Sequence, residues 1–202
     1  LIHHIDLDDQ TKLIDEAGQE MGNEGILMSG IVPNTLKTAG QLIEAQSKLQ
    51  RPPDVYLLMP VGGVHNPDGL YDEYMRFGEK YGQEYGARFI HYFRQPRDRD
   101  TLVKLVNESP HFVGIKVGTD EGDVQPLIEG VGDNGLIIWG IGDRSTKAAK
   151  LGAKGHTSGI AVVCARASDE LNNAQRKGDY EASQQVEAKI AALEEIRFRN
   201  GR

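Results

Sequence analysis

Short apolar runs alternate along the chain with longer segments that mix apolar and polar residues. The apolar runs are rich in Val and Ile and predict six β-strands, at residues 25–32, 55–61, 87–93, 112–118, 135–142 and 155–163. The segments between them have helical periodicity and end at turn residues; they cover residues 35–50, 69–86, 100–109, 123–132 and 144–153. This order predicts a parallel sheet with right-handed crossovers, in either a doubly wound sheet or a (β/α)₈ barrel.

The two ends of the chain add helices to this pattern. Residues 6–21 predict a helix with an acidic N-cap ahead of the first strand, and residues 169–199 predict two helices separated by a break at Gly178 and Asp179. A long helical tail favours the barrel over the open sheet. We therefore expect a partial barrel in residues 1–165 followed by a helical extension in residues 166–202.

The composition is that of an ordinary globular protein and argues against several function classes. The 202 residues are 39% hydrophobic and 26% charged, and no apolar run is long enough to span a bilayer. The first ten residues lack the features of a signal peptide, so a cytoplasmic protein without a membrane partner is the expectation. A net charge of -7 without a basic stripe argues against nucleic-acid binding. The single cysteine, Cys164, cannot form an internal disulfide or a thiolate metal cluster.

One lysine interrupts the apolar run at residues 112–118. Strict alternation places Val113, Ile115 and Val117 on one face, suited to cover by helices. It places Lys116 on the other face, with Phe112 and two glycines, where the side chain would project into a barrel interior. A buried amine has a lowered pKa and becomes a nucleophile for carbonyl carbons, as a Schiff-base enzyme requires. The alternative is a lysine near a strand end whose side chain reaches solvent.

Tyr92 and Arg97 form a second candidate group. Tyr92 closes the third predicted strand, where a phenol at the mouth of a barrel can transfer a proton. Arg97 follows in the loop, and a guanidinium can hold a carboxylate through two hydrogen bonds. Each residue also has a simpler interpretation: Tyr92 as a core residue, and Arg97 as a surface residue near Asp98 and Asp100.

The glycine-rich stretches and the terminal histidines give no support for a cofactor or a metal. The sequence GIG at residues 140–142 does not continue into a dinucleotide-binding fingerprint, and residues 152–159 lack the ending of a P-loop. We expect that second stretch to bring backbone close to a ligand, with Thr157 and Ser158 offering carbonyl and hydroxyl groups. His3 and His4 invite a metal interpretation, but they lie at an unanchored terminus, which argues against it.

Taken in order, the motifs at residues 25–35, 57–71, 91–97, 112–123 and 137–159 resemble the superfamily of dihydrodipicolinate synthase and N-acetylneuraminate lyase, which are class I aldolases. The resemblance implies a TIM barrel in which Lys116 forms an imine with pyruvate or another 2-keto acid. It further implies that Tyr92 is the catalytic tyrosine, that Arg97 binds the substrate carboxylate, and that a backbone carbonyl near Thr157 contacts the keto acid. It also implies a homo-oligomer, a dimer or a tetramer.

The sequence departs from this family in two places. Only strands three to eight of the barrel can be assigned, so we expect the sequence given to be incomplete at its N-terminus, without the first two strands and the carboxylate-binding loop. The synthases carry a tyrosine pair after the fourth strand, where this chain has Pro60-Val61-Gly62-Gly63, with His65 nearby as the substitute. This difference, with the segment WGIGD at residues 139–143, indicates a divergent acceptor pocket.

The resemblance thus implies a lyase or synthase that acts on pyruvate or a 2-keto-3-deoxy acid through a Schiff base, without a cofactor. A dehydratase of the same family would begin with the same intermediate. A catalytically silent member with a binding role would fit the absent loop, and a phosphate-binding barrel isomerase would fit the architecture but not the lysine.

Overall fold

The computed structural model describes residues 5–32, 35–60 and 66–199. The chain folds into two compact units, residues 1–115 and 116–202. The predicted division into a partial barrel at 1–165 and an extension at 166–202 stays a prediction.

Five strands form one sheet, and all five lie within predicted strands. Their order in the sheet is the order in the sequence: β1 (Met28–Ile31), β2 (Val55–Leu58), β3 (Phe89–Phe93), β4 (Phe112–Val117) and β5 (Leu136–Trp139). The first three strands pair in parallel, with Met28 opposite Val55 and Tyr56 opposite Phe89. A helix follows each strand, so the predicted parallel α/β fold is confirmed.

The helices agree with the sequence pattern to within a few residues at each end. They are α1 (Leu7–Met21), α2 (Leu36–Gln46), α3 (Pro67–Tyr85), α4 (Arg99–Glu108), α5 (Val124–Val131), α6 (Ser145–Lys150), α7 (Ala165–Arg176) and α8 (Tyr180–Phe198). Asp6 caps α1 by accepting a hydrogen bond from the backbone of Asp9, as expected for an acidic N-cap. The break predicted at Gly178 and Asp179 separates α7 from α8, and Asp179 caps α8.

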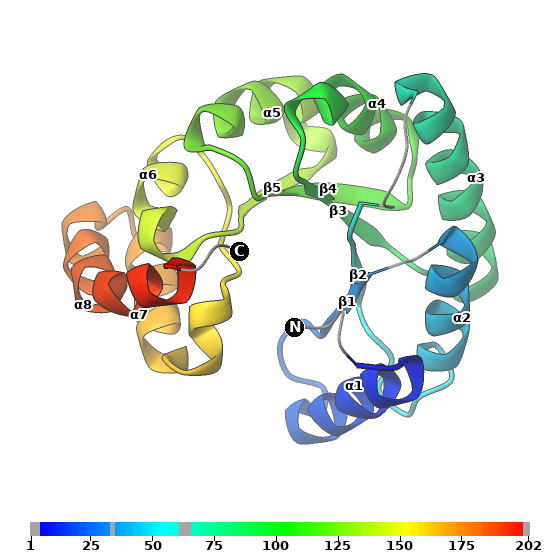
Figure 1. Cartoon of the computed structure of the whole chain (residues 1–202), viewed down its shortest axis with the longest axis horizontal. Coiled ribbons are helices and arrows are strands. Elements are labelled where there is room, and N and C mark those ends of the chain that lie inside the picture. Colours follow the sequence, from blue (N-terminus) through cyan, green and yellow to red (C-terminus); the bar gives the residue numbers. More distant parts are fainter. Residues whose placement is uncertain (1–4, 33–34, 61–65, 200–202) are drawn as a thin grey trace. The chain divides into compact units, whose positions relative to one another are not determined.

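Aromatic side chains fill the core of the first unit. Phe89 on β3 lies between Phe77 of α3 and Phe112 of β4, with ring centroids 5.4 and 5.2 Å away. Tyr74 of α3 meets the edge of His91, which is also on β3. In Figure 1, α2 and α3 lie along the same side of β1, β2 and β3, which is the side that these rings occupy. The contacts fix α3 against the sheet through a large buried apolar area.

The second unit has a small aliphatic cluster and a network of buried polar groups. Its helices α6, α7 and α8 pack on one another (Figure 1), around Ile160, Leu171, Val186 and Ile190. Glu187 of α8 caps α6: its Oε1 accepts hydrogen bonds from Ser145 Oγ at 3.0 Å and from the backbone of Thr146 at 2.6 Å. This cap joins two helices that are far apart in the sequence.

The sixth predicted strand does not form as a strand within the described residues. Residues 155–157 make one isolated parallel bridge, between His156 and Trp139 at the end of β5. The chain then turns into a 3₁₀-helix, Gly159–Val162, which Ser158 caps. Val162 and Val163 are largely exposed, so this apolar run forms a short turn and not a buried strand. The prediction of a strand over residues 155–163 is therefore wrong beyond the bridge.

The alternation predicted for β4 is also wrong in part. Phe112 is buried against rings and helix α3, where a Cβ on Gly78 would lie 2.7 Å from its ring. Val113, which we had expected under the helices, is half-buried, as is Lys116, whereas Ile115 and Val117 are fully buried. The burial of the side chains along β4 therefore does not follow the strict period of two that the sequence predicts.

Candidate functional site

Lys116 is the next-to-last residue of β4 and the first residue of the second unit. Its side chain is half-buried, between the fully buried Ile115 and Val117. It is therefore neither free in bulk water nor as deeply buried as the sequence pattern suggested. A lysine at this depth can reach a ligand at the carboxyl end of the strand, which is where parallel α/β folds bind their ligands.

Tyr92 holds the equivalent position on the neighbouring strand, as the next-to-last residue of β3. Its side chain is buried, and the guanidinium of Arg94 lies over its ring at 5.3 Å. The residues on either side, His91 and Phe93, are fully buried in the helical layer and the core. Alternation along the strand then places Tyr92 on the opposite face from His91.

Arg97 lies in a 3₁₀-turn, Pro96–Asp98, which follows β3. More than half of its side chain is exposed, and its Nε is 3.6 Å from a carboxylate oxygen of Asp98. An ion pair at this distance, with its guanidinium in solvent, is weak, so a substrate carboxylate can compete for the guanidinium. The sequence expectation that Arg97 is a surface residue near Asp98 agrees with this geometry, and its role in binding stays a prediction.

The segment around Thr157 and Ser158 is held from two sides. The backbone N–H of Thr157 donates to the carbonyl of Trp139 at 2.8 Å, which ties the segment to the end of β5. The hydroxyl of Ser158 donates to Glu194 of α8 at 3.0 Å, so it already has an internal partner. The hydroxyl of Thr157 is buried and makes no hydrogen bond within the described residues. Of the two side chains, that of Thr157 is the one with unused hydrogen-bonding capacity.

Charged side chains gather on the loops that follow β4 and β5. Glu121, in the turn after β4, is almost fully buried and lies 3.4 Å from Arg144 and 3.7 Å from Lys147. The guanidinium of Arg144 also lies over the ring of Trp139, the last residue of β5. A buried carboxylate with two cationic partners joins the two loops. The sequence analysis missed this cluster, because its partners are more than twenty residues apart.

Metal binding has no support in the described part of the chain, where no three His, Cys, Asp or Glu side chains come together as ligands. His3, His4 and His65, together with Val61, Gly62 and Gly63, lie outside the described residues. Among the described helices, none combines the length and the apolar character that crossing a bilayer requires.

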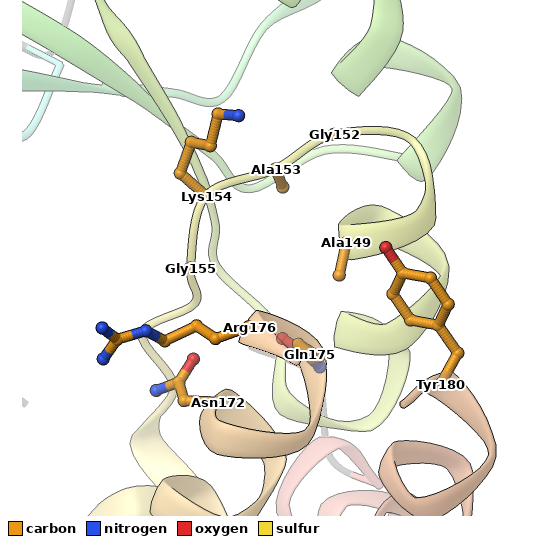
Figure 2. Close-up of a pocket in the computed structure, with 9 residues that line it drawn as sticks. All are labelled: Ala149, Gly152, Ala153, Lys154, Gly155, Asn172, Gln175, Arg176 and Tyr180. Carbon is orange, nitrogen blue, oxygen red and sulfur yellow. The ribbon is translucent and has the colours of Figure 1, made fainter. Parts of the chain in front are cut away.

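A separate pocket of about 360 Å³ lies in the second unit (Figure 2). Its wall comes from α6, from the segment before His156, from the end of α7 and from the start of α8; the residues are Ala149, Gly152, Ala153, Lys154, Gly155, Asn172, Gln175, Arg176 and Tyr180. None of the predicted site residues lines it. Its two cations, Lys154 and Arg176, are exposed, and its Gln175 amide already donates to Ser145 and Ser183.

Comparison with known proteins assigns the family. The model of the dihydrodipicolinate synthetase family matches residues 98–202, which are 105 of the 202 residues. The chain belongs to this family. The 4-hydroxy-tetrahydrodipicolinate synthase of Thermodesulfovibrio yellowstonii is 27% identical over 96% of this chain and 67% of its own length.

Solved structures of the dihydrodipicolinate synthetase family agree with the fold. The dihydrodipicolinate synthase of Acinetobacter baumannii, solved with pyruvate, superposes with a TM-score of 0.84 at 24% identity, over 96% of this chain and 67% of that enzyme. The sialic acid aldolase of Ruminococcus gnavus gives a TM-score of 0.79 at 13% identity, over 94% of this chain and 64% of its own. The chain therefore spans about two thirds of the length of these relatives, and over that length the predicted TIM-barrel fold is confirmed.

Proposed function

We propose that this protein forms a Schiff base between Lys116 and pyruvate or a 2-keto-3-deoxy acid, and makes or breaks the carbon–carbon bond next to the imine. The observation that carries the proposal is the place of Lys116: a half-buried amine, next to last on a parallel strand, in a member of the dihydrodipicolinate synthetase family. A lysine in such a position has a cost in desolvation that a purely structural residue would avoid.

The proposed chemistry begins when the neutral amine of Lys116 attacks the ketone carbon and water leaves. The resulting iminium accepts the electron pair of the bond that breaks, which gives an aldehyde and an enamine. Protonation of the enamine and hydrolysis of the imine then release pyruvate and the free amine. Condensation runs through the same steps in reverse.

Tyr92 would transfer the proton that bond cleavage or formation requires, because it is next to last on β3 and a phenol can act as a general acid and base. Arg97 would bind the keto-acid carboxylate, and the backbone carbonyl of Thr157 would contact the bound acid. By the same resemblance, the active species would be a homo-oligomer, a dimer or a tetramer, which light scattering of the purified protein tests.

Borohydride reduction in the presence of pyruvate tests the central step. We expect a stable adduct of one carboxyethyl group on Lys116, located by peptide mass analysis, and no adduct when borohydride is used without pyruvate. The variant Lys116→Arg should lose the adduct, whereas Lys154→Arg, at an exposed lysine, should keep it. No adduct in the folded wild-type protein, or an adduct on another lysine, would contradict the proposal.

The variant Tyr92→Phe separates imine formation from proton transfer. It should still be trapped by borohydride but should lose about 10²- to 10⁴-fold in turnover of a cleavable substrate. Panels of 2-keto-3-deoxy sugar acids, assayed for pyruvate release and for loss of water, then distinguish an aldolase from a dehydratase.

A further inference from the structure

Glu194 on α8 is a fully buried carboxylate. It lies against two turns of the second unit, one at Gly142 and one at Ser158. Its Oε1 accepts the hydrogen bond from Ser158, directly after Thr157. Its Oε2 accepts from Arg197, one turn later on α8, with Nη2 2.6 Å and Nε 2.8 Å away. A carboxylate buried this completely is stable only with charged and hydrogen-bonding partners. Its contacts with Ser158 and Arg197 therefore offset the cost of removing the charge from water.

The carboxylate also lies directly against the turn after β5. A Cβ built on Gly142 would be 2.7 Å from Glu194 Oε1 and 3.0 Å from Ser158 Oγ. Such distances leave no room for a side chain, so the glycine allows the carboxylate to pack on the backbone there. The same group therefore contacts both the end of the β5 segment and the segment that carries Thr157.

Ser158 is fixed by more than this one bond. Its hydroxyl oxygen accepts from the backbone N–H of Ile160 as the cap of the 3₁₀-helix, while its hydrogen goes to Glu194. The preceding residue, Thr157, is bonded to Trp139 through its own N–H. The peptide that contains the Thr157 carbonyl lies between these two anchors, one on β5 and one on α8.

We propose that Glu194 is the positioning residue of the keto-acid-binding segment, residues 156–159, and acts through the hydroxyl of Ser158. The proposal rests on the function proposed above, since it assigns the Thr157 carbonyl to the bound keto acid. Glu194 itself touches no substrate. Its role is to hold the carbonyl of Thr157 at a fixed distance from β5, with Arg197 balancing the buried charge. The C-terminal helix thereby becomes part of substrate binding and not only of the fold.

Three variants separate this role from simple stabilisation. Ser158→Ala removes the link and leaves the Glu194–Arg197 pair in place. Glu194→Ala removes both, and Glu194→Gln keeps an oxygen that can accept from Ser158. The matched control is Glu195→Gln, at the next residue of α8, whose side chain is exposed.

The measurement is the pyruvate concentration that half-saturates borohydride trapping at Lys116, recorded with the melting temperature of each variant. Ser158→Ala and Glu194→Ala should raise this concentration about tenfold, the effect of losing one hydrogen bond to a charged group. The maximal trapping rate should change little, because neither residue contacts the amine. Glu194→Gln should restore most of the affinity, and Glu195→Gln should match the wild type.

The double variant that combines Ser158→Ala with Glu194→Ala should bind pyruvate no more weakly than Glu194→Ala alone, because the two residues act through one contact. A wild-type protein that traps pyruvate, with Ser158→Ala unchanged in half-saturation, overturns this inference and leaves the proposed function standing. A wild-type protein that traps no pyruvate overturns the proposed function and this inference with it. If Glu194→Ala does not fold, Ser158→Ala alone decides between these outcomes.

Discussion

Different kinds of contact stabilise the interiors of the two units. In the first, the interior between β3, β4 and α3 is a cluster of rings, in which Phe77, Phe89 and Phe112 follow one another at 5.4 and 5.2 Å. In the second, the helices α6, α7 and α8 share a smaller aliphatic cluster and are joined by hydrogen bonds to two carboxylates, the half-buried Glu187 and the fully buried Glu194. The ring cluster depends on buried apolar area, whereas the packing of α6, α7 and α8 also depends on the geometry of individual hydrogen bonds.

This difference has consequences for how each unit tolerates change. Apolar burial is non-directional, so a ring can be exchanged for another apolar side chain of similar volume at modest cost. A hydrogen bond to a buried carboxylate fails when either partner is removed, because the remaining partner stays buried and unpaired. The second unit should therefore be sensitive to the loss of single polar atoms, and the first unit to the loss of volume.

The largest effect on stability should come from the ring cluster. Phe112 is 1% exposed and contacts Tyr74, Phe89 and the face of α3 at Gly78. Phe112→Ala should cost about 3–5 kcal/mol of unfolding free energy, measured by urea denaturation, because it removes the ring and leaves a cavity. Phe112→Leu, which keeps most of the volume, should cost less than half of that. Equal losses for the two variants would show that the cluster depends on ring geometry and not on volume.

His91 is the polar exception inside the ring cluster, and it predicts a pH dependence. Burial lowers the pKa of His91 from 6.5 to about 3, an effect that the backbone of Tyr92 opposes only in part. Above pH 6.5 the residue is neutral in both states and contributes no pH dependence. Below 6.5 the unfolded chain binds a proton that the folded chain does not, so stability falls by about 1.4 kcal/mol per pH unit until pH 3.

Urea denaturation at pH 7.0 and pH 4.5 measures this dependence. The wild-type protein should lose about 3 kcal/mol from His91 between these two values. His91→Leu should lose correspondingly less. An unchanged slope in His91→Leu would show that His91 is not the residue responsible.

The cap of α6 by Glu187 should give the next effect in size. Glu187→Ala leaves the hydroxyl of Ser145 and the backbone N–H of Thr146 without their acceptor, and should cost about 1–3 kcal/mol. Gln184→Ala, at an exposed position of the same helix, should cost less than about 0.5 kcal/mol. Equal stability of the two variants would break the comparison between the units, because it would mean that the second also depends mainly on its apolar cluster.

The same contrast explains what the sequence could predict. Residues 87–93 and 112–118 contain strands because apolar β-formers bounded by turn residues are a local signal. The acidic cap at Asp6 and the break at Gly178 were equally visible, since each depends on neighbours within a few positions. Lys116 and Tyr92 stood out because a polar group in an apolar strand is unusual, and both lie next to the end of their strands.

What the sequence could not predict depends on partners distant in the chain. Ser158 and Glu194 are 36 residues apart, so no local pattern relates them; the substrate contact expected of Ser158 stays a prediction. Residues 160–163 were predicted as strand because their apolar side chains suggest burial. The hydrophobic pattern of a sequence does not show whether those side chains are exposed to solvent. The predicted face of Phe112 on β4 was wrong, because its partners Tyr74 and Gly78 on α3 are distant in the chain.

The smallest effect should come from a polar link of the first unit that lies near its surface. Arg51 holds Asp54 through two parallel hydrogen bonds, Nη1 to Oδ1 at 3.1 Å and Nη2 to Oδ2 at 2.7 Å, and Asp54 also accepts from the backbone of Leu27. These bonds lower the pKa of Asp54, so its contribution is present at neutral pH and is lost as the pH falls below the carboxyl's unfolded value.

Both side chains of this pair are partly exposed, and solvent weakens their attraction. Asp54→Asn should therefore cost only about 1 kcal/mol at pH 7, measured by urea denaturation, and nearly nothing at pH 3. The largely exposed pair of Glu44 and Lys48 is the control, and Glu44→Gln should leave the stability nearly unchanged. A loss at Asp54 as large as that at Glu187 would show that a bidentate pair near the surface can match the cap of α6 in strength.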